Sequence, residues 1–345
     1  MSAITTELPR RAVGKTGVSV SILGFGGVQV GDYFVTLPEE VAIGAIAEAY
    51  ASGIRYFDTA PRYGRGLSEH RIGHVLRGQR RDDFVLSTKV GRNLAPDNSL
   101  ANNPDRLGLP FKFVPDLSYD GTMRGVEQSL HRLGLSRVDF VFIHVVERRE
   151  HGNEYPAKFR EAMDGCYRAL VELREQKVIN GIGAGINDAD ACMDLLRAAD
   201  LDSLMPAGRY TVMEQHSLDD IMPLAEEKGV SIICGAPFNS GVGATGLQPT
   251  SRYGNKPIEP QVLERIRGVE AVCKAHGVEM AAAALQFPLA HPNVVTVVPG
   301  MASAEEVRRN IELLQAPIPA DFWADLKARK LMREDAPVPS APPLT

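Results

Sequence analysis

The stretch that decides the fold is residues 55–76, which read RYFDTAPRYGRGLSEHRIGHVL. A short apolar strand over Ile54–Phe57 breaks at Asp58 into a loop rich in Gly and Pro, and the chain then continues as a helix. Asp58 and Tyr63 therefore follow the carboxyl end of a strand. In alternating β/α proteins this is the edge at which the chemistry is done. Ser68 is predicted to be the N-cap of the helix, because its side chain can accept from the first free backbone N–H groups.

The same strand-then-helix unit recurs along the chain. Eight short, mostly apolar strands are predicted, over Ser21–Gly27, Ile54–Phe57, Phe84–Val90, Val138–His144, Ile182–Asn187, Ser203–Tyr210, Ser231–Pro237 and Val294–Gly300. Helical patterns follow, among them Met123–Leu133, Phe159–Gln176, Asp188–Ala199, Ser217–Lys228, Gln261–His276 and Ala304–Leu314. Such apolar strands are typical of a parallel sheet buried on both faces. Eight units favour a closed (β/α)8 TIM barrel of the α/β class over an open sheet.

Segments outside the repeat are assigned by their composition. The polar N-terminus contains the turn Gly14–Gly17 and is predicted to form a β-hairpin. The long segments 91–115 and 145–156 follow strands, so we expect them to be top-face loops that cover a substrate. The tail 336–345 is mostly Pro, Ala and Ser and is expected to be extended or flexible. No linker is visible, so residues 1–345 are predicted to be a single domain.

Composition excludes several classes of function. The chain has 345 residues, a net charge of −5, 44% hydrophobic and 23% charged residues, which is the profile of a globular protein with no nucleic-acid footprint. No signal peptide or long apolar run is present, so we expect a cytoplasmic protein without a membrane span. Four cysteines without metal-ligand spacing indicate reduced thiols: Cys166, Cys192, Cys234 and Cys273. His70 and His74 lack a third ligand, so we expect a surface pair and no metal.

Three further polar residues lie at the ends of predicted strands: Lys89, His144 and Asn187. With Asp58 and Tyr63 they would surround one mouth of the barrel. A Tyr hydroxyl titrates near 10, and a nearby ammonium group lowers that pKa. This set is suited to moving a proton at an oxygen while a hydride moves at the adjoining carbon.

Other interpretations of these residues remain open. Asp58 could form only an Asx-turn, and Lys89 could be an ordinary exposed strand end. A hydrolase could use Asp58 and Glu69, although Tyr63 and Lys89 would then have no role. A barrel that serves as a binding or regulatory subunit with slow turnover is a further possibility.

The motifs resemble those of the aldo-keto reductase family. The resemblance rests on DTA at Asp58, YG at Tyr63, SE at Ser68, STK ending at Lys89 and FIH ending at His144, and it spans residues 10 to about 315. It implies a (β/α)8 barrel that binds NADP or NAD without a Rossmann domain, and no GxGxxG motif is present. By this resemblance Tyr63 is the acid or base, Lys89 and Asp58 tune it, and His144 orients the substrate oxygen. The implied cofactor-binding residues are Gly26, Gly27, Asn187, Arg209, Phe238, Asn239, Ser240, Gly241, Gly300, Glu306 and Asn310.

Departures from the family pattern concern the cofactor. Where the family usually has Ser-Asn, this chain has Ile186-Asn187. Where the family usually has Gln, it has Ala207, and Arg209 could take the place of that Gln. The cations that pair with a 2′-phosphate are replaced by Gly300 and Glu306. A carboxylate repels a phosphate but accepts from ribose hydroxyls, so we expect NAD to be preferred over NADP. Two structural interpretations stay open: Glu306 could cap its helix from Ser303, and Asn187 could be an N-cap.

A narrower resemblance, to the sugar 1-dehydrogenase branch, rests on AGRYT over Ala207–Thr211 and PFNSG over Pro237–Gly241. It implies that a small cyclic hemiacetal is oxidised to its lactone, with Tyr63 as the base. The hemiacetal would be an aldose such as L-fucose or L-galactose, or pyridoxal. The alternative is an NADPH-dependent reductase of aldehydes or ketones. We expect a monomer or a small homo-oligomer.

Overall fold

The computed structural model describes residues 7–101, 103, 107–144, 146–254 and 256–344. Eight parallel strands form its central sheet: β3 (Phe25–Gly26), β4 (Tyr56–Asp58), β5 (Val85–Val90), β8 (Phe140–His144), β9 (Gly181–Ile186), β10 (Ser203–Pro206), β11 (Ser231–Gly235) and β14 (Val294–Val298). Their order is β14-β11-β10-β9-β8-β5-β4-β3. Isolated parallel bridges, Leu23 to Val297 and Gly26 to Gly300, join the two end strands. The predicted (β/α)8 barrel is confirmed.

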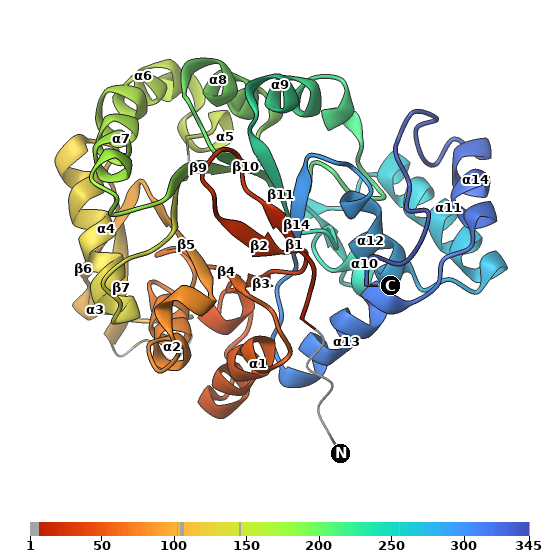
Figure 1. The fold of residues 1–345 in the computed structure, drawn as a ribbon, viewed down its shortest axis with the longest axis horizontal. Helices are drawn as coiled ribbons and strands as arrows, with labels where there is room; N and C mark the ends of the chain where they lie inside the picture. Colours follow the sequence, from red (N-terminus) through yellow and green to blue (C-terminus); the bar gives the residue numbers. More distant parts are fainter. Residues whose placement is uncertain (1–6, 102, 104–106, 145, 255, 345) are drawn as a thin grey trace.

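Helices surround the ring on its outside (Figure 1). They are α1 (Glu39–Ala51), α2 (Leu67–Leu76), α3 (Asn98–Ala101), α4 (Tyr119–Leu133), α5 (Arg148–His151), α6 (Tyr155–Glu161), α7 (Arg168–Glu175), α8 (Ala189–Ala198), α9 (Ile221–Lys228), α10 (Val242–Thr245), α11 (Pro260–His276), α12 (Met280–Leu289), α13 (Ala304–Gln315) and α14 (Ala320–Ala328). A π-helical segment, Ala162–Tyr167, makes α6 and α7 one continuous rod. The longer helices cover the ring with an apolar face, as in α1, where Ala42, Ala45, Ile46 and Ala49 are buried.

A hairpin of β1 (Arg10–Ala12) and β2 (Ser19–Ser21) closes one end of the barrel, as predicted. Figure 1 shows the hairpin crossing the middle of the ring. Arg11 donates to backbone carbonyls at the start of β14 and at the end of α12. Val13 and Val20 pack among the residues that fill the inside of the ring. Since the hairpin covers the end where the strands begin, the carboxyl ends of the strands face the opposite side.

Several segments differ from the prediction. The second expected loop, 145–156, contains the short helix α5 and the start of α6. The segment 91–115, expected to be a loop, contains an antiparallel pair of β6 (Arg92–Pro96) and β7 (Phe111–Pro115). Helix α12 was not predicted because all but its first residue are buried, which leaves no amphipathic period to recognise. Two further two-residue strands, β12 (Arg252–Tyr253) and β13 (Lys256–Pro257), pair with each other.

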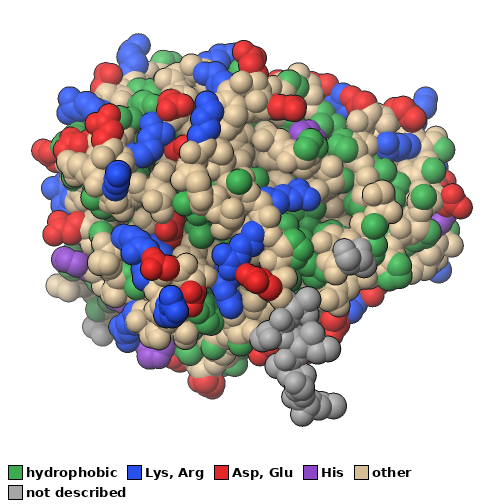
Figure 2. All heavy atoms as spheres, in the orientation of Figure 1, with side chains coloured by type: hydrophobic (Ala, Val, Ile, Leu, Met, Phe, Trp, Pro, Cys, Tyr) green, Lys and Arg blue, Asp and Glu red, His purple; other side chains and the backbone are tan. Residues whose placement is uncertain are grey.

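The described part of the C-terminal tail, residues 336–344, packs against the barrel. Ala336 is buried, and Val338 and Leu344 pack against the core, so the described part of the tail lies on the barrel. Thr345, and Val145 at the start of the second expected loop, lie outside the described residues. Figure 2 shows basic and acidic side chains interspersed over one face of the molecule.

Several further predictions concern membranes, metals and thiols. Among the described residues, no helix is both long and apolar enough to cross a membrane. The same residues contain no group of three or more His, Cys, Asp or Glu side chains that could hold a metal ion. His70 and His74 are both exposed, as expected of a surface pair. All four cysteines are free and buried, and burial raises the pKa of the Cys166 thiol to about 12.

Candidate active site

Lys89 and Asp58 form a buried ion pair at the carboxyl end of β5 and β4. The Lys89 Nζ atom lies 2.6 Å from both Asp58 carboxylate oxygens and 3.0 Å from the Thr59 carbonyl oxygen, to which it also donates. Ser87 donates to Asp58 at 2.7 Å. Burial alone would lower the pKa of Lys89, but the charges and hydrogen bonds of Asp58 and Tyr63 together outweigh this effect, and the pKa is raised. The lysine therefore stays protonated. Its side chain is only 2% exposed, which excludes the interpretation of Lys89 as an ordinary exposed strand end.

Tyr63 lies against this pair. The Lys89 Nζ atom is 5.1 Å from the centroid of the Tyr63 ring, and the ring of Tyr33 packs edge-on with a centroid separation of 6.2 Å. Burial raises the pKa of Tyr63, and the positive charge of Lys89 opposes this, but the net direction is upward. The expectation that Lys89 would bring the pKa of Tyr63 below its usual value is wrong here, because desolvation of the phenolate exceeds the attraction of the ammonium.

His144 is the last residue of β8 and belongs to the same mouth. Burial lowers the pKa of His144 well below 6.5, and the positive charges of Lys89, Arg62 and Arg92 lower it further. The imidazole is therefore neutral at pH 7, with one nitrogen able to donate a hydrogen bond and the other able to accept one.

A tight loop between β4 and α2 places Tyr63. Its backbone N–H donates to the Ala60 carbonyl at 3.0 Å. Gly64 follows with a left-handed φ of 64°, and a Cβ at this position would lie 1.7 Å from the Gly31 carbonyl oxygen. Only glycine fits this approach, so the Tyr-Gly pair is required by the geometry of the loop.

Ser68 does not cap α2, so that prediction is wrong. Gly66 precedes the helix with a left-handed φ of 95°, and Ser68 lies buried within the first turn. Its hydroxyl donates to the Gly27 carbonyl at 2.7 Å and lies 2.8 Å from the Thr59 hydroxyl. Ser68 thus ties the Tyr63 loop to the segment after β3.

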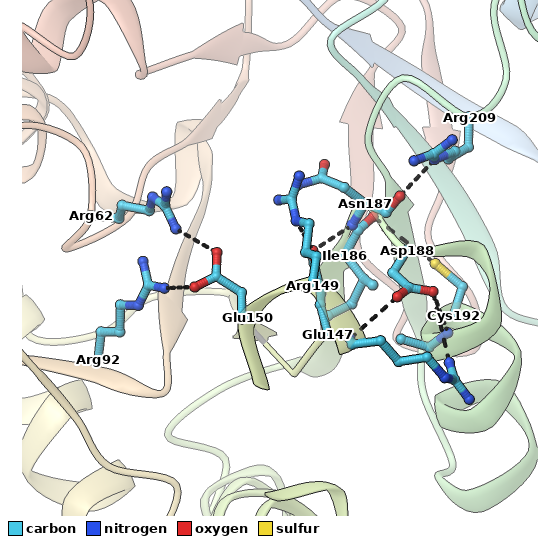
Figure 3. A network of polar contacts seen from close by, with 12 residues as sticks. Arg62, Arg92, Glu147, Arg149, Glu150, Ile186, Asn187, Asp188, Cys192 and Arg209 are labelled. Atoms are coloured by element: carbon cyan, nitrogen blue, oxygen red, sulfur yellow. Dashed lines mark hydrogen bonds and ion pairs between the residues drawn. The ribbon is translucent and has the colours of Figure 1, made fainter. Parts of the chain in front are cut away.

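Asn187 follows β9, and its backbone is held from both sides (Figure 3). Glu147 accepts from its N–H at 2.8 Å, and Arg209 Nε donates to its carbonyl at 2.6 Å. The N-cap interpretation of Asn187 is wrong, because the side chain of Asp188 caps α8 by accepting from the backbone of Ala191. Among the described residues, no hydrogen-bond partner is found for the side-chain amide of Asn187.

The predicted cofactor residues of the first strand have a structural role. A Cβ on Gly26 would lie 2.7 Å from the Pro299 carbonyl oxygen, and one on Gly27 would lie 2.5 Å from the Ser68 hydroxyl. Gly300, at the opposite end of the closing bridge, pairs with Gly26. Gly26 thus allows the first and last strands to approach each other and close the ring, while Gly27 allows the segment after β3 to pack against α2.

The loop after β11 contains Phe238, Asn239, Ser240 and Gly241. Its last three residues have left-handed φ values of 46°, 61° and 95° in succession. Non-glycine residues adopt this conformation only when the surroundings enforce it, and such strain concentrates at ligand sites. Asn239 is buried, and its side chain donates to the Tyr253 hydroxyl at 3.2 Å.

Glu306 and Asn310 lie on α13. The Glu306 carboxylate accepts from the backbone of Ala302 at 2.7 Å, and the Ser303 hydroxyl accepts from the backbone of Glu306 at 3.2 Å. The capping interpretation of Glu306 is therefore confirmed. Asn310 is buried further along the same helix.

An arginine-rich network at the mouth was missed by the sequence analysis. Arg62 and Arg92 both contact Glu150, and Arg149 pairs with Glu147. The position of Arg62 directly before Tyr63 was the one available signal. Arg92, Glu147, Arg149 and Glu150 come from the segments that follow β5 and β8, whose approach to the site could not be predicted from the sequence.

The comparisons with known proteins agree with this geometry. The model of the aldo/keto reductase family matches residues 22–330. The chain belongs to the aldo-keto reductase family. It is 35% identical over 337 residues to a pyridoxal 4-dehydrogenase of Microbacterium luteolum, which covers 94% of this chain and 98% of the relative. It is also 35% identical over 330 residues to a D-threo-aldose 1-dehydrogenase of a Pseudomonas species, covering 93% and 97%.

Solved structures of aldo-keto reductases share the fold. The holo form of aldo-keto reductase AKR11C1 from Bacillus halodurans superposes with a TM-score of 0.75 at 25% identity, covering 97% of this chain and 99% of that one. Membership of the family makes the protein an NAD(P)-dependent oxidoreductase acting on CH–OH or carbonyl groups. Two features of this chain fit a nicotinamide dinucleotide: the unpartnered amide of Asn187 and the left-handed run 239–241.

Proposed function

We propose that the protein oxidises a small cyclic hemiacetal to its lactone with NAD, using Tyr63 as the base. The observation that carries the proposal is the contact between the Tyr63 ring and the protonated, buried Lys89, which is itself fixed by Asp58. Support for the substrate class comes from the relatives at 35% identity, which are named for the oxidation of pyridoxal and of an aldose. L-fucose, L-galactose and pyridoxal are the first candidates.

The residues would share the reaction as follows. Tyr63 accepts the proton of the anomeric hydroxyl, while the hydrogen on the anomeric carbon leaves as a hydride. The electron pair of the broken O–H bond forms the second bond between the anomeric carbon and its oxygen, and the product is the lactone. His144, being neutral, donates a hydrogen bond that orients the substrate oxygen. A bound nicotinamide supplies the hydride acceptor.

Residues for the cofactor follow from their positions. Asn187 would bind the carboxamide of the nicotinamide, with Arg209 holding its backbone. Residues 238–241 would cover the pyrophosphate. Gly300, Glu306 and Asn310 would lie at the adenosine end, with Gly26 and Gly27 at the base of the site. A carboxylate at position 306 favours ribose hydroxyls over a 2′-phosphate, so we propose a preference for NAD.

The test is a substrate screen with both cofactors. NADH formation would be measured with L-fucose, L-galactose and pyridoxal, and each rate repeated with NADP. We expect oxidation of at least one of them, with a higher kcat/KM for NAD. No turnover on all three, together with reduction of simple aldehydes by NADPH, would favour the alternative reductase. A higher kcat/KM with NADP would reject the cofactor preference alone.

A further inference from the structure

Two arginines share one carboxylate beside Tyr63. Arg92 Nη2 lies 2.6 Å from Glu150 Oε2, and Arg62 Nη1 lies 3.4 Å from Glu150 Oε1. Arg62 Nε also donates to the Tyr33 hydroxyl at 3.1 Å, and the Tyr33 ring packs against Tyr63. Figure 3 shows the two guanidinium groups converging on Glu150. The pair is therefore part of the wall around the reacting phenol.

The charges at this mouth do not balance. Two guanidinium groups face the single carboxylate of Glu150, which leaves one positive charge in excess. The field of Arg62 and Arg92 reaches the reacting centre, since both contribute to the low pKa of His144. Two other cations of the mouth each have a carboxylate partner, Lys89 with Asp58 and Arg149 with Glu147.

Both arginines keep donors for a ligand. A guanidinium group carries five N–H donors, whereas among the described residues Arg62 donates to Tyr33 and Glu150, and Arg92 donates to Glu150. Their side chains are 28% and 15% exposed, so part of each reaches solvent at the mouth. The contacts with Glu150 show that the spacing of the two groups suits an anion with two oxygens.

We propose that Arg62 and Arg92 form a binding site for an anionic group of the substrate, a carboxylate or a phosphate. The inference rests on the proposed function and narrows its substrate to a cyclic hemiacetal that carries such a group. A uronate and an aldose phosphate have this chemistry. Glu150 holds the two arginines together without a ligand, and a bound anion would share or replace its contacts.

The experiment compares galactose, galacturonate and galactose 6-phosphate, which have the same ring configuration and differ at one carbon. Turnover would be measured with NAD, and binding by calorimetry in the presence of NADH. We expect kcat/KM or affinity to be at least about tenfold higher for one of the anionic sugars, which corresponds to about 1.4 kcal/mol, since hydrogen bonds between a guanidinium group and an anion are stronger than neutral ones. The better of the two identifies carboxylate or phosphate. High salt should reduce the advantage.

Variants separate recognition from a structural role. Arg62→Gln and Arg92→Gln should each abolish most of the anion advantage, measured as the ratio of kcat/KM for the anionic sugar to kcat/KM for galactose in the same variant. Glu150→Gln should increase the advantage, because it removes the competing carboxylate. Arg65→Gln is the matched control, because Arg65 lies in the same loop but contacts Phe113 and the Phe111 carbonyl.

The outcomes distinguish the two proposals. Oxidation of galactose with equal or better kcat/KM than both anionic sugars overturns the anion site and leaves hemiacetal oxidation standing. If no sugar is oxidised, the binding data decide: tighter binding of an anionic sugar that is lost in Arg92→Gln supports the site, and equal binding of all three overturns it. If the variants reduced kcat/KM or binding by the same factor for neutral and anionic sugars, the network would have only a structural role and the anion site would be overturned.

Discussion

At the scale of single residues, Tyr63 is subject to two opposing effects. Burial favours the neutral phenol, while Lys89 favours the phenolate, and the first is larger. Lys89 in turn keeps its charge because Asp58 lies at 2.6 Å. Without a ligand the phenol is therefore protonated at neutral pH, and oxidation has to begin with loss of this proton.

Replacement of Tyr63 by phenylalanine tests its role as acid or base. Tyr63→Phe should lower kcat by about 10²–10⁴, the usual contribution of a positioned proton-transfer group. Binding of NADH, followed by its fluorescence, should remain unchanged. Tyr155→Phe is the control, because the Tyr155 hydroxyl donates to Asp194 away from the reacting group. A variant Tyr63→Phe with unaltered kcat would contradict the proposal.

The rates of oxidation and of reduction should depend differently on pH. Burial raises the pKa of Tyr63 above 10.0 in the ligand-free enzyme, and oxidation requires the phenolate, so kcat/KM for oxidation should rise with pH throughout the range below 10.0. Reduction requires the protonated phenol and should be constant over the same range. Steady-state rates in both directions measure this. A plateau of the oxidation rate near neutral pH would argue against Tyr63 as the titrating group.

At the scale of secondary-structure elements, a buried ion pair holds α2 and α4 together. Glu69 is fully buried in the first turn of α2 and accepts from Thr88 at 2.8 Å and from Arg132 Nε at 2.6 Å. Nearby, a Cβ on Gly73 would lie 2.1 Å from the Leu133 carbonyl oxygen, so the helices touch closely. Because α2 follows the Tyr63 loop, this contact also fixes the loop.

Removal of Arg132 should destabilise the protein strongly. Arg132→Met leaves the Glu69 carboxylate buried without its cation, at an expected loss of about 3–5 kcal/mol in the free energy of unfolding. The control Arg309→Met removes an exposed partner of Glu279 and should change stability by no more than about 1 kcal/mol. Urea denaturation measures both. Equal effects of the two variants would contradict the buried-pair argument.

At the scale of the whole molecule, the two ends of the barrel have separate tasks. The hairpin of β1 and β2 fills the end where the strands begin, with Val13 and Val20 in the inner core. Asp58, Lys89 and His144 lie at the other end of their strands. Stability and chemistry can therefore be changed independently.

Truncation of Val20 should affect stability without affecting catalysis. Val20→Ala removes two buried carbons from the inner core, and we expect a loss of roughly 1.5–3 kcal/mol. The KM and kcat of the folded variant should equal those of the parent, because the site lies at the opposite end. Thermal unfolding and steady-state kinetics on one preparation test this. A changed kcat with unchanged stability would show that the hairpin communicates with the site.

The sequence by itself determined the barrel and the positions of Asp58, Lys89 and His144. Eight apolar strands that alternate with amphipathic helices can bury their apolar surfaces in few ways. In such a barrel, a residue at the end of a strand must lie at the rim. It did not determine the ends of the elements. Ser68 matched an N-cap pattern, but packing against Gly27 placed it inside the helix.

Only the tertiary structure decided what lies around the reacting group. The direction of the pKa of Tyr63 depends on the balance between burial and the charge of Lys89, and burial is a property of the whole fold. The convergence of Arg62 and Arg92 on Glu150 joins residues up to 88 positions apart. Local patterns do not record such distances, because they depend on how the loops pack once the ring has closed.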